Sequence, residues 1–324
     1  MRLLFICFLC CAVLPWGPAL SARGQQVPAG AAFAVVPLGV QGGLAEGNLS
    51  AYLVAEAGST DFVCLDAGSL RTGIEKAVAN HVFPVPADEV LTQYIKAYCL
   101  SHAHLDHVAG LLLNAPDDSP KPIYGLPDCL ATLQNDYFNW RAWPNFGSGG
   151  NAPALRKYQL QPLVPQQVVP IANTRLSVQA FVLSHGSPMQ SAAFLVRSHD
   201  SYLLYLGDTG ADEVEKVHNL HRLWQAVQPL VQRRQLKAIF IEASYANSQP
   251  PQQLFGHLTP ALLMQEMAAL AQLTGKAALR GLPVVVTHRK PSAGNDAAIK
   301  AQLAGANTLQ LRLVFPEQGQ LLTF

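Results

Sequence analysis

The sequence predicts an α/β fold in a single domain, and three observations support this prediction. Short runs rich in β-branched and aromatic residues are bounded by Gly, Ser or Asn, which is typical of strands. Several of these runs are followed by stretches with helical periodicity. Hydrophobic residues make up 50% of the 324 positions, which is sufficient for a substantial buried core.

The amino-terminal half opens with β-rich segments. Turn residues separate three predicted strands, at residues 33–38, 49–54 and 61–65. A helix is expected over residues 74–80. The next apolar run, residues 97–100, stops abruptly before a cluster of histidines. We therefore expect this cluster at a strand end, where a rigid element can hold it.

The carboxy-terminal half repeats the alternation of strand and helix. One long helix is expected over residues 211–232, and Thr259, Pro260 and Gly275 provide start and stop signals for another. Residues 137–151 are aromatic and then glycine-rich, which predicts an inserted loop. The predicted strands of this half cover residues 176–183, 192–197, 202–206, 238–241 and 283–287.

The first 22 residues have the features of a secretory signal peptide. Arg2 precedes an apolar run that is too short to span a bilayer comfortably, and two prolines and small residues follow. We expect cleavage near residue 22, a mature domain of residues 23–324 without a membrane span, and a periplasmic or secreted location. The mature chain keeps Cys64, Cys99 and Cys129, an odd number, so at least one thiol should stay free.

The charge of the chain argues against a nucleic acid or a membrane surface as its partner. Charged residues are 13% of the chain and the formal net charge is +1, so no general attraction to polyanions is expected. The expected partner is a small molecule, and an anionic substrate would have to be captured locally. The oligomeric state is not defined by the sequence.

The most informative segment is HAHLDH, which places His102, His104, Asp106 and His107 within six residues. Neutral imidazole nitrogen and carboxylate oxygen are good ligands for Zn²⁺. The pattern should arise by chance in well under ~1% of such chains. We therefore predict a metal site at this strand end.

The segment SHAHLDHVAGL, preceded by LDAG, resembles the metallo-β-lactamase superfamily. This resemblance implies a four-layer αββα sandwich with metals bound at the strand ends. The chain is more closely similar to the class II cyclic-nucleotide phosphodiesterases, a branch of that superfamily, in EGNLSAYLV, LDAGS, NWRAWPNF, LSHG, GDTG, IEASYAN, GHLTP and VTHRKP. The implied activity is hydrolysis of 3′,5′-cyclic nucleotides to 5′-monophosphates, with cyclic AMP as the first expectation and cyclic GMP as the alternative.

The resemblance also assigns the ligands of two divalent metal ions, for which zinc is the expected element. Two such ions would activate a shared water and clamp the substrate. Asp66 is expected to accept a hydrogen bond from a metal-bound histidine. By resemblance, one metal is held by His102, His104 and His185, the other by Asp106, His107 and His288, and Asp208 bridges both.

The catalytic candidates are Asp106, His257 and Glu242. In this hypothesis a hydroxide shared by the metals attacks phosphorus opposite the 3′ oxygen. His257 is the candidate that protonates the leaving alkoxide, and Glu242 would orient or charge it. The alternatives are a helix-capping or core histidine and an ordinary ion-pair carboxylate.

Substrate contacts are predicted in two places. Ser187 follows LSHG and is a candidate for positioning phosphate, while Asn139 and Trp143 are candidates for packing around the base or sugar. The alternative for the aromatic segment is a loop that is anchored to the domain by its hydrophobic side chains.

Two competing functions fit the same metal site. A related hydrolase would act on a lactam, lactone or thioester carbonyl, and a protein of another class would bind a nucleotide or zinc in the periplasm without turnover. The pairing of IEASYAN with GHLTP favours the phosphodiesterase, because an alkoxide leaving phosphorus benefits from an acid more than a lactam does.

Overall fold

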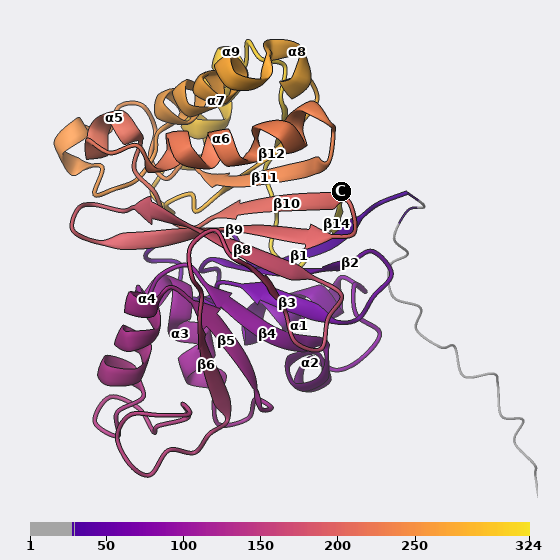
Figure 1. The fold of residues 1–324 in the computed structure, drawn as a ribbon, viewed down its shortest axis with the longest axis vertical. Helices are drawn as coiled ribbons and strands as arrows, with labels where there is room; N and C mark the ends of the chain where they lie inside the picture. The colour runs from indigo at the N-terminus through magenta and orange to yellow at the C-terminus, as the bar shows by residue number, and fades with distance from the viewer. Residues whose placement is uncertain (1–27, 29) are drawn as a thin grey trace, which may run out of the picture.

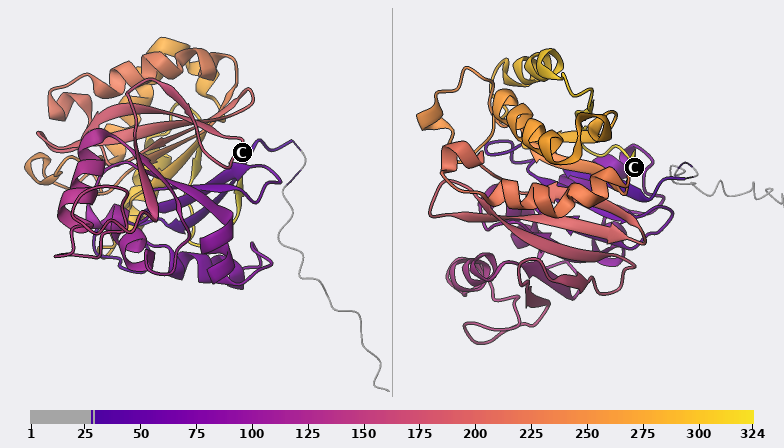
Figure 2. Two further views of the ribbon diagram at one scale, coloured as in Figure 1. Left: turned by 60° about the horizontal axis from the view of Figure 1, so that its bottom comes forward. Right: turned by 45° about the horizontal axis from the view of Figure 1, so that its top comes forward.

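Two seven-stranded β-sheets lie face to face, and helices cover their outer faces (Figure 1). The computed structural model describes residue 28 and residues 30–324, so the predicted signal peptide lies outside the described residues. Two further views show that the helices of the first half and those of the second half lie on opposite sides of the paired sheets (Figure 2). The layers follow the order helix, sheet, sheet, helix, as the four-layer αββα expectation requires.

The first sheet contains most strands of the amino-terminal half. Strands β3 to β6 run parallel to one another, whereas β1 pairs antiparallel with β14 and β2, and β2 pairs antiparallel with β3. The strand order is β14 (Leu322–Thr323), β1 (Phe33–Gly39), β2 (Ala51–Glu56), β3 (Phe62–Leu65), β4 (Ile95–Leu100), β5 (Lys121–Gly125) and β6 (Tyr158–Pro162).

The second sheet is built from the carboxy-terminal half. Strands β10 to β13 run parallel, and β7 to β10 form antiparallel hairpins. The strand order is β13 (Arg312–Val314), β12 (Pro283–Thr287), β11 (Leu236–Glu242), β10 (Ser201–Leu206), β9 (Gln190–Ser198), β8 (Ser177–Ser184) and β7 (Val168–Pro170).

The helices connect the strands and pack on the outside of the sandwich. The first half contributes α1 (Arg71–Ala79), α2 (Ala87–Glu89), the π-helix η1 (Val90–Tyr94), α3 (Leu105–Asn114), α4 (Pro127–Thr132) and the π-helix η2 (Leu133–Tyr137). The second half contributes α5 (Asp212–Glu215), α6 (Asn219–Gln232), the 3₁₀ turn η3 (Pro251–Gln253), α7 (Pro260–Thr274), α8 (Lys276–Leu279) and α9 (Asn295–Ala306).

Three hydrophobic clusters correspond to the three contacts between the four layers. One lies between the first sheet and its helices, another between the second sheet and its helices, and the third between the sheets. Tyr52 and Phe240 meet edge to face across the two sheets, with ring centroids 5.5 Å apart. Successive side chains of a strand point to opposite faces, so each inner strand supplies two of these clusters.

The predicted strands are present with boundaries shifted by a few residues, but the expected long helix is not continuous. Instead of one helix over residues 211–232, the chain forms α5 and α6, separated by Lys216 in the left-handed conformation at φ 58°. Asp212 supplies the start of α6, because its carboxylate accepts the backbone N–H groups of Leu220 and His221. The cap predicted for α7 is confirmed, since the Thr259 hydroxyl accepts the N–H of Leu262.

The three cysteines of the described chain are buried free thiols. Among residue 28 and residues 30–324, no helix has the length and apolar character needed to cross a membrane.

Candidate metal centre

Six strand ends bring polar side chains together at one edge of the sandwich. Asp66 follows β3, His102 follows β4, His185 follows β8, Asp208 follows β10, Glu242 ends β11 and His288 follows β12. The parallel strands of each sheet end at the same edge, so residues distant in sequence meet there. The sequence motif therefore lies at a strand end, as expected.

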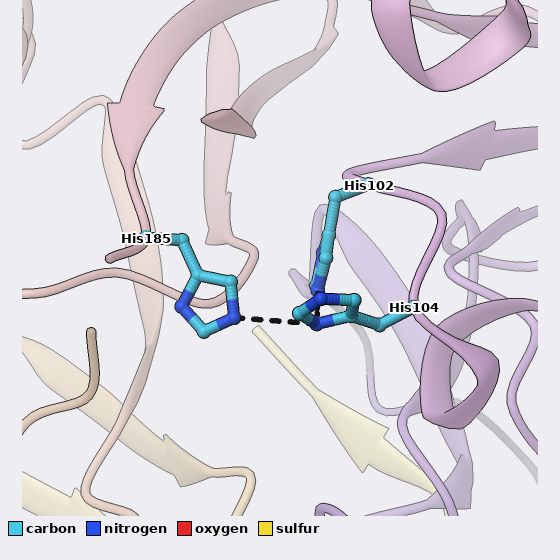
Figure 3. Close-up of side chains that lie close together, drawn as sticks. All are labelled: His102, His104 and His185. Atoms are coloured by element: carbon cyan, nitrogen blue, oxygen red, sulfur yellow. Dashed lines mark hydrogen bonds between the residues drawn. The ribbon is translucent and has the colours of Figure 1, made fainter. Parts of the chain in front are cut away.

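The first group consists of His102, His104 and His185, whose imidazoles point toward one another (Figure 3). His104 Nδ1 lies 3.0 Å from His102 Nε2 and 3.3 Å from His185 Nε2. Three nitrogens around a tetrahedral zinc would be roughly 3.3 Å apart, given Zn–N bonds of about 2.0–2.1 Å. The group therefore has suitable spacing for one metal ion.

The second group consists of Asp106, His107, Asp208 and His288. Asp106 and His107 lie in the first turn of α3, which begins inside the HAHLDH motif. His288 Nε2 lies 3.1 Å from Asp106 Oδ2 and 3.2 Å from Asp208 Oδ2. His107 Nε2 lies 3.2 Å from Asp208 Oδ1.

Asp208 lies between the two groups. Its Oδ2 atom is 3.8 Å from His185 Nε2 and 3.9 Å from His102 Nε2, while its two oxygens also contact His107 and His288. The side chain is buried with 2% of its surface exposed. A carboxylate in this position can offer one oxygen to each of two cations.

Four of the histidines are oriented through their Nδ1 atoms. The Nδ1–H of His107 donates to Asp66 at 2.8 Å, and that of His185 donates to the Gly256 carbonyl at 2.9 Å. Asp66 and a carbonyl are acceptors, so in the neutral form of each ring the proton is on Nδ1 and Nε2 carries a lone pair directed at the centre.

Two serines complete this arrangement. Ser101 donates its hydroxyl hydrogen to Asp66 and accepts from His102 Nδ1 at 3.0 Å. Ser244 donates to Glu242 and accepts from His288 Nδ1 at 2.9 Å. Sequence reasoning identified Asp66 but missed Ser101, Ser244 and Gly256. Only Ser101 carries a local signal, since it directly precedes His102.

Asp66 organises the first-sheet side of the centre. Besides His107, its carboxylate accepts from the Ser101 N–H at 2.7 Å and from the Tyr205 hydroxyl at 2.7 Å. Asp66 is fully buried and adopts a left-handed backbone conformation at φ 54°. Tyr205 belongs to the second sheet, so Asp66 links both sheets to the metal candidate His107.

Close backbone packing secures the opposite side. A Cβ on Gly42 would lie 2.1 Å from a ring atom of His288, so no other residue fits there. The neighbouring Gly43 N–H donates to Asp106 Oδ2 at 2.7 Å. His288 itself has a left-handed φ of 51°, a conformation that is strained for a residue with a side chain.

The electrostatics leave several imidazoles neutral, which is the form that binds metals. Burial and the neighbouring His107 hold the pKa of His102 well below its ordinary value, and burial together with His185 lowers the pKa of His104. Burial also lowers the pKa of His288. For His107, burial acts in the same direction, but the carboxylates of Asp208 and Asp66 outweigh it and raise the pKa.

The donor set fits a divalent cation for two reasons. The Nε2 lone pairs of His102 and His185 both point at His104 Nδ1. This nitrogen carries at most one proton, so it cannot donate a full hydrogen bond to both. His107 Nε2 is buried and, although it lies 3.2 Å from Asp208 Oδ1, it forms no hydrogen bond within the described part of the chain. A buried nitrogen without a partner is costly, and a cation between these groups would satisfy it.

Glu242 and His257 lie beside the second group. His257 Nδ1 is 3.1 Å from both Glu242 oxygens, and its ring stacks on His288 at a centroid distance of 5.0 Å. Burial lowers the pKa of His257, but the charge and hydrogen bond of Glu242 outweigh it, so the net shift is upward. Glu242 also accepts from the Thr209 N–H at 2.8 Å.

The predicted substrate contacts Asn139 and Trp143 lie away from the metal candidates. Asn139 Oδ1 accepts the N–H groups of Arg141 and Ala142, so its side chain stabilises its own turn. Trp143 lines a separate apolar cavity that contains none of the metal candidates. Neither residue lines the cavities that border His104, because the 137–151 segment packs onto the first half of the domain through buried Phe138 and Phe146.

Ser187 lies on the loop after His185, but its backbone is already held by another residue. Glu215 Oε2 accepts from the Ser184 hydroxyl at 2.7 Å, from the Gly186 N–H at 3.0 Å and from the Ser187 N–H at 3.3 Å. This carboxylate on α5 ties down the loop that carries His185. Sequence reasoning missed Glu215, which is 30 residues beyond His185.

Comparisons with known proteins agree with this architecture. The crystal structure of unliganded yeast PDE1 superposes with a TM-score of 0.80 at 24% identity, covering 91% of this chain and all of that chain. The metallo-β-lactamase fold protein YhfI from Bacillus subtilis superposes with a TM-score of 0.60 at 15% identity, covering 90% of this chain and 99% of that chain. The chain therefore has the metallo-β-lactamase fold.

The sequence comparisons are more specific. A 3′,5′-cyclic-nucleotide phosphodiesterase from Aliivibrio fischeri is 42% identical over 90% of this chain and 93% of its own length. A probable 3′,5′-cyclic-nucleotide phosphodiesterase from Yersinia pestis is 41% identical over 89% of this chain and 88% of its own length. The family described as class-II cAMP phosphodiesterases matches residues 84–319. The chain therefore belongs to the class II cAMP phosphodiesterase family.

Proposed function

We propose that this protein is an enzyme that hydrolyses 3′,5′-cyclic nucleotides to nucleoside 5′-monophosphates with the help of two divalent metal ions. The observation that carries the proposal is the position of Asp208, which lies between two convergent ligand groups and close to His257. Relatives at 41–42% identity carry the corresponding enzyme name, which supports the same substrate class here.

We assign one ion to His102, His104 and His185 and the other to Asp106, His107 and His288, with Asp208 shared. Nitrogen and carboxylate oxygen in this proportion favour zinc over magnesium or calcium. Bound at these residues, the ions would supply an activated water at neutral pH and stabilise charge on the phosphoryl oxygens.

The chain supplies the proton for the leaving group through His257. Glu242 holds Nδ1 of this ring, so Nε2 is the atom available to a substrate. The upward pKa shift caused by Glu242 keeps the ring protonated closer to neutral pH. As the P–O3′ bond breaks, His257 Nε2 donates its proton to the 3′ oxygen, and the product is the 5′-monophosphate.

Lys290 is suited to attracting the anionic substrate. Its Nζ atom lies 3.2 Å from the position that a Cβ on Gly43 would occupy, and Gly43 binds the ligand Asp106. In the described residues this ammonium forms no ion pair, whereas its neighbour Arg289 is engaged by Asp296 at 2.6 Å. A free cation beside the centre compensates for the small net charge of the chain.

Export is a separate part of the proposal and rests on the sequence of residues 1–22. Expression of the full chain in a bacterial host, followed by fractionation and amino-terminal sequencing, tests it. A periplasmic or secreted product that begins near residue 23 supports export, and an intact chain in the cytoplasm contradicts it.

The central experiment uses purified protein with a determined metal content. It is incubated with 3′,5′-cyclic AMP, and 5′-AMP is followed by chromatography with and without a chelator. Chelator-sensitive formation of 5′-AMP supports the proposal. A zinc-loaded protein that leaves cyclic AMP and cyclic GMP intact but hydrolyses nitrocefin or an acyl-homoserine lactone contradicts it.

A further inference from the structure

A cavity of about 320 Å³ borders His102 and His104 and is not used by the chemistry described above. Its size lies within the range of small-molecule sites, which is about 300–1,000 Å³. One wall is formed by α4 and the other by the turn between β8 and β9. Its lining includes Asp128, Cys129, Thr132, Pro188, Met189 and Gln190.

The walls of this cavity are apolar. Cys129 lines one side with 7% of its surface exposed, and Pro188 and Met189 line the other side. Tyr137 also borders the cavity, and its hydroxyl is fixed by donation to the Ala103 carbonyl at 3.0 Å. Sulfur and ring atoms of this kind pack well against the face of an aromatic ligand.

Three polar side chains of the lining have no protein partner. Asp128 and Thr132 lie four residues apart on α4 and therefore on the same face of the helix. Gln190 begins β9 on the other wall. None of the three side chains takes part in a hydrogen bond or ion pair in the described part of the chain, so all three are available to a ligand.

The neighbouring cavities lack such groups. The one lined by His185, Gly186 and Phe255 offers no polar side chain apart from the metal candidates, and the one beside Trp143 borders no metal candidate. The Asp128 carboxylate also repels a phosphate, so an anionic ligand must place its phosphate at the metal end of the cavity.

We propose that this cavity is the nucleobase subsite and that Asp128 accepts a hydrogen bond from an exocyclic amino group of the base. This inference rests on the proposed function, because it assigns the part of a cyclic nucleotide that is remote from phosphorus. Adenine would donate a hydrogen bond from its N6 amino group to Asp128 and accept one at N1 from the Thr132 hydroxyl. Guanine would donate hydrogen bonds from its N1–H and its N2 amino group to the two carboxylate oxygens of Asp128.

The inference is tested with two pairs of substrates that differ in one amino group. Cyclic GMP is compared with cyclic IMP, and cyclic AMP with the cyclic monophosphate of purine riboside. The expected preference for the amino-bearing member is about tenfold in kcat/KM, the low end for a charged hydrogen bond because Asp128 is exposed. D128A should bring both ratios close to one. It should leave kcat/KM unchanged for the purine riboside compound, which has no donor for Asp128, whereas cyclic IMP keeps its N1–H and should lose some activity.

Two further variants sharpen the result. D128N keeps one oxygen acceptor, so it should retain more of the adenine preference than of the guanine preference. D136A removes another exposed carboxylate close to Tyr137 and should leave both ratios unchanged. This control separates a specific contact from a general loss of negative charge.

Unchanged ratios in D128A, together with normal hydrolysis of cyclic AMP and cyclic GMP, would overturn the subsite and leave the proposed function intact. Failure of the zinc-loaded wild-type protein to hydrolyse any of the four compounds would overturn the proposed function and the subsite with it. Loss of both preferences in D128A alone supports the subsite.

Discussion

His257 Nδ1 lies 3.1 Å from each oxygen of Glu242, and both side chains are buried. The pair stands next to the metal candidates, since His257 Nδ1 is also 3.8 Å from Asp208. A carboxylate held so close fixes the orientation of the ring and favours its protonated form. The contact with Glu242 therefore favours His257 as a proton donor rather than as a further metal ligand, and the two roles can be distinguished by experiment.

We predict that H257A lowers kcat for cyclic AMP by roughly 10²–10⁴-fold, the usual contribution of a general acid. Zinc content should stay unchanged. The loss should be much smaller for bis(p-nitrophenyl) phosphate, because nitrophenolate leaves without protonation. Steady-state kinetics and elemental analysis of the same preparations check this.

Its control is H218A, because His218 is exposed and, although it is the N-cap residue of α6, its side chain forms no capping hydrogen bond. Equal losses for both substrates, together with a lower zinc content, would place His257 among the ligands instead.

We predict that E242Q moves the alkaline limb of the pH profile of kcat to lower pH. In the wild-type protein Glu242 raises the pKa of His257. A general acid is active below its pKa, so activity falls as the pH rises through that value. Removal of the carboxylate charge lowers the pKa of His257, and the fall should begin earlier.

The measurement is kcat against pH for E242Q and wild type at saturating cyclic AMP. Thermal melting of both proteins shows whether the variant is folded. An alkaline limb that stays in place in a folded E242Q would rule out Glu242 as the residue that charges His257.

The metal candidates could be proposed from the sequence because these residues obey a local rule. Each follows an apolar run, and His102, His104, Asp106 and His107 are adjacent to one another. The supporting contacts obey no such rule. Gly256 meets His185 across 71 residues, so only the folded chain brings them together.

Features that depend on the folded chain are harder to predict from the sequence. Asn139 and Trp143 lie in an aromatic segment that suggests a stacking surface, but Asn139 is needed for its own turn. The cavity beside His104 lies between α4 and the turn before β9, and nothing in the sequence of either segment indicates that they share a site. The interruption between α5 and α6 lies at Lys216, a residue type that does not signal a left-handed conformation.

We predict that zinc stabilises the protein and that D208A removes most of this effect. Ligand at 1,000 times its Kd adds roughly 4 kcal/mol, which corresponds to a rise in Tm on the order of 8 °C for a chain of this size. Asp208 lies between both ligand groups, so its loss should weaken both sites.

Scanning calorimetry of chelator-treated protein with and without added zinc checks this prediction, and elemental analysis gives the metal content. The expected wild-type content is two ions per chain. A D208A protein that keeps two zinc ions and the full rise in Tm would show that Asp208 does not bridge them.

We predict that E215A lowers kcat/KM for cyclic AMP and that E215Q restores it. The three contacts of Glu215, to the Ser184 hydroxyl and to the N–H groups of Gly186 and Ser187, all use the same oxygen, Oε2. The side-chain carbonyl of glutamine can replace that oxygen, whereas alanine leaves the loop without an anchor. This loop carries His185 and the Pro188 and Met189 wall of the nucleobase cavity, so its movement should raise KM and reduce zinc occupancy.

Each of the three hydrogen bonds contributes about 1 kcal/mol, and water can replace part of this at a half-exposed site, so a loss of about tenfold is expected in E215A. If E215Q were as impaired as E215A, the negative charge of Glu215 rather than its anchoring contacts would be the property that matters.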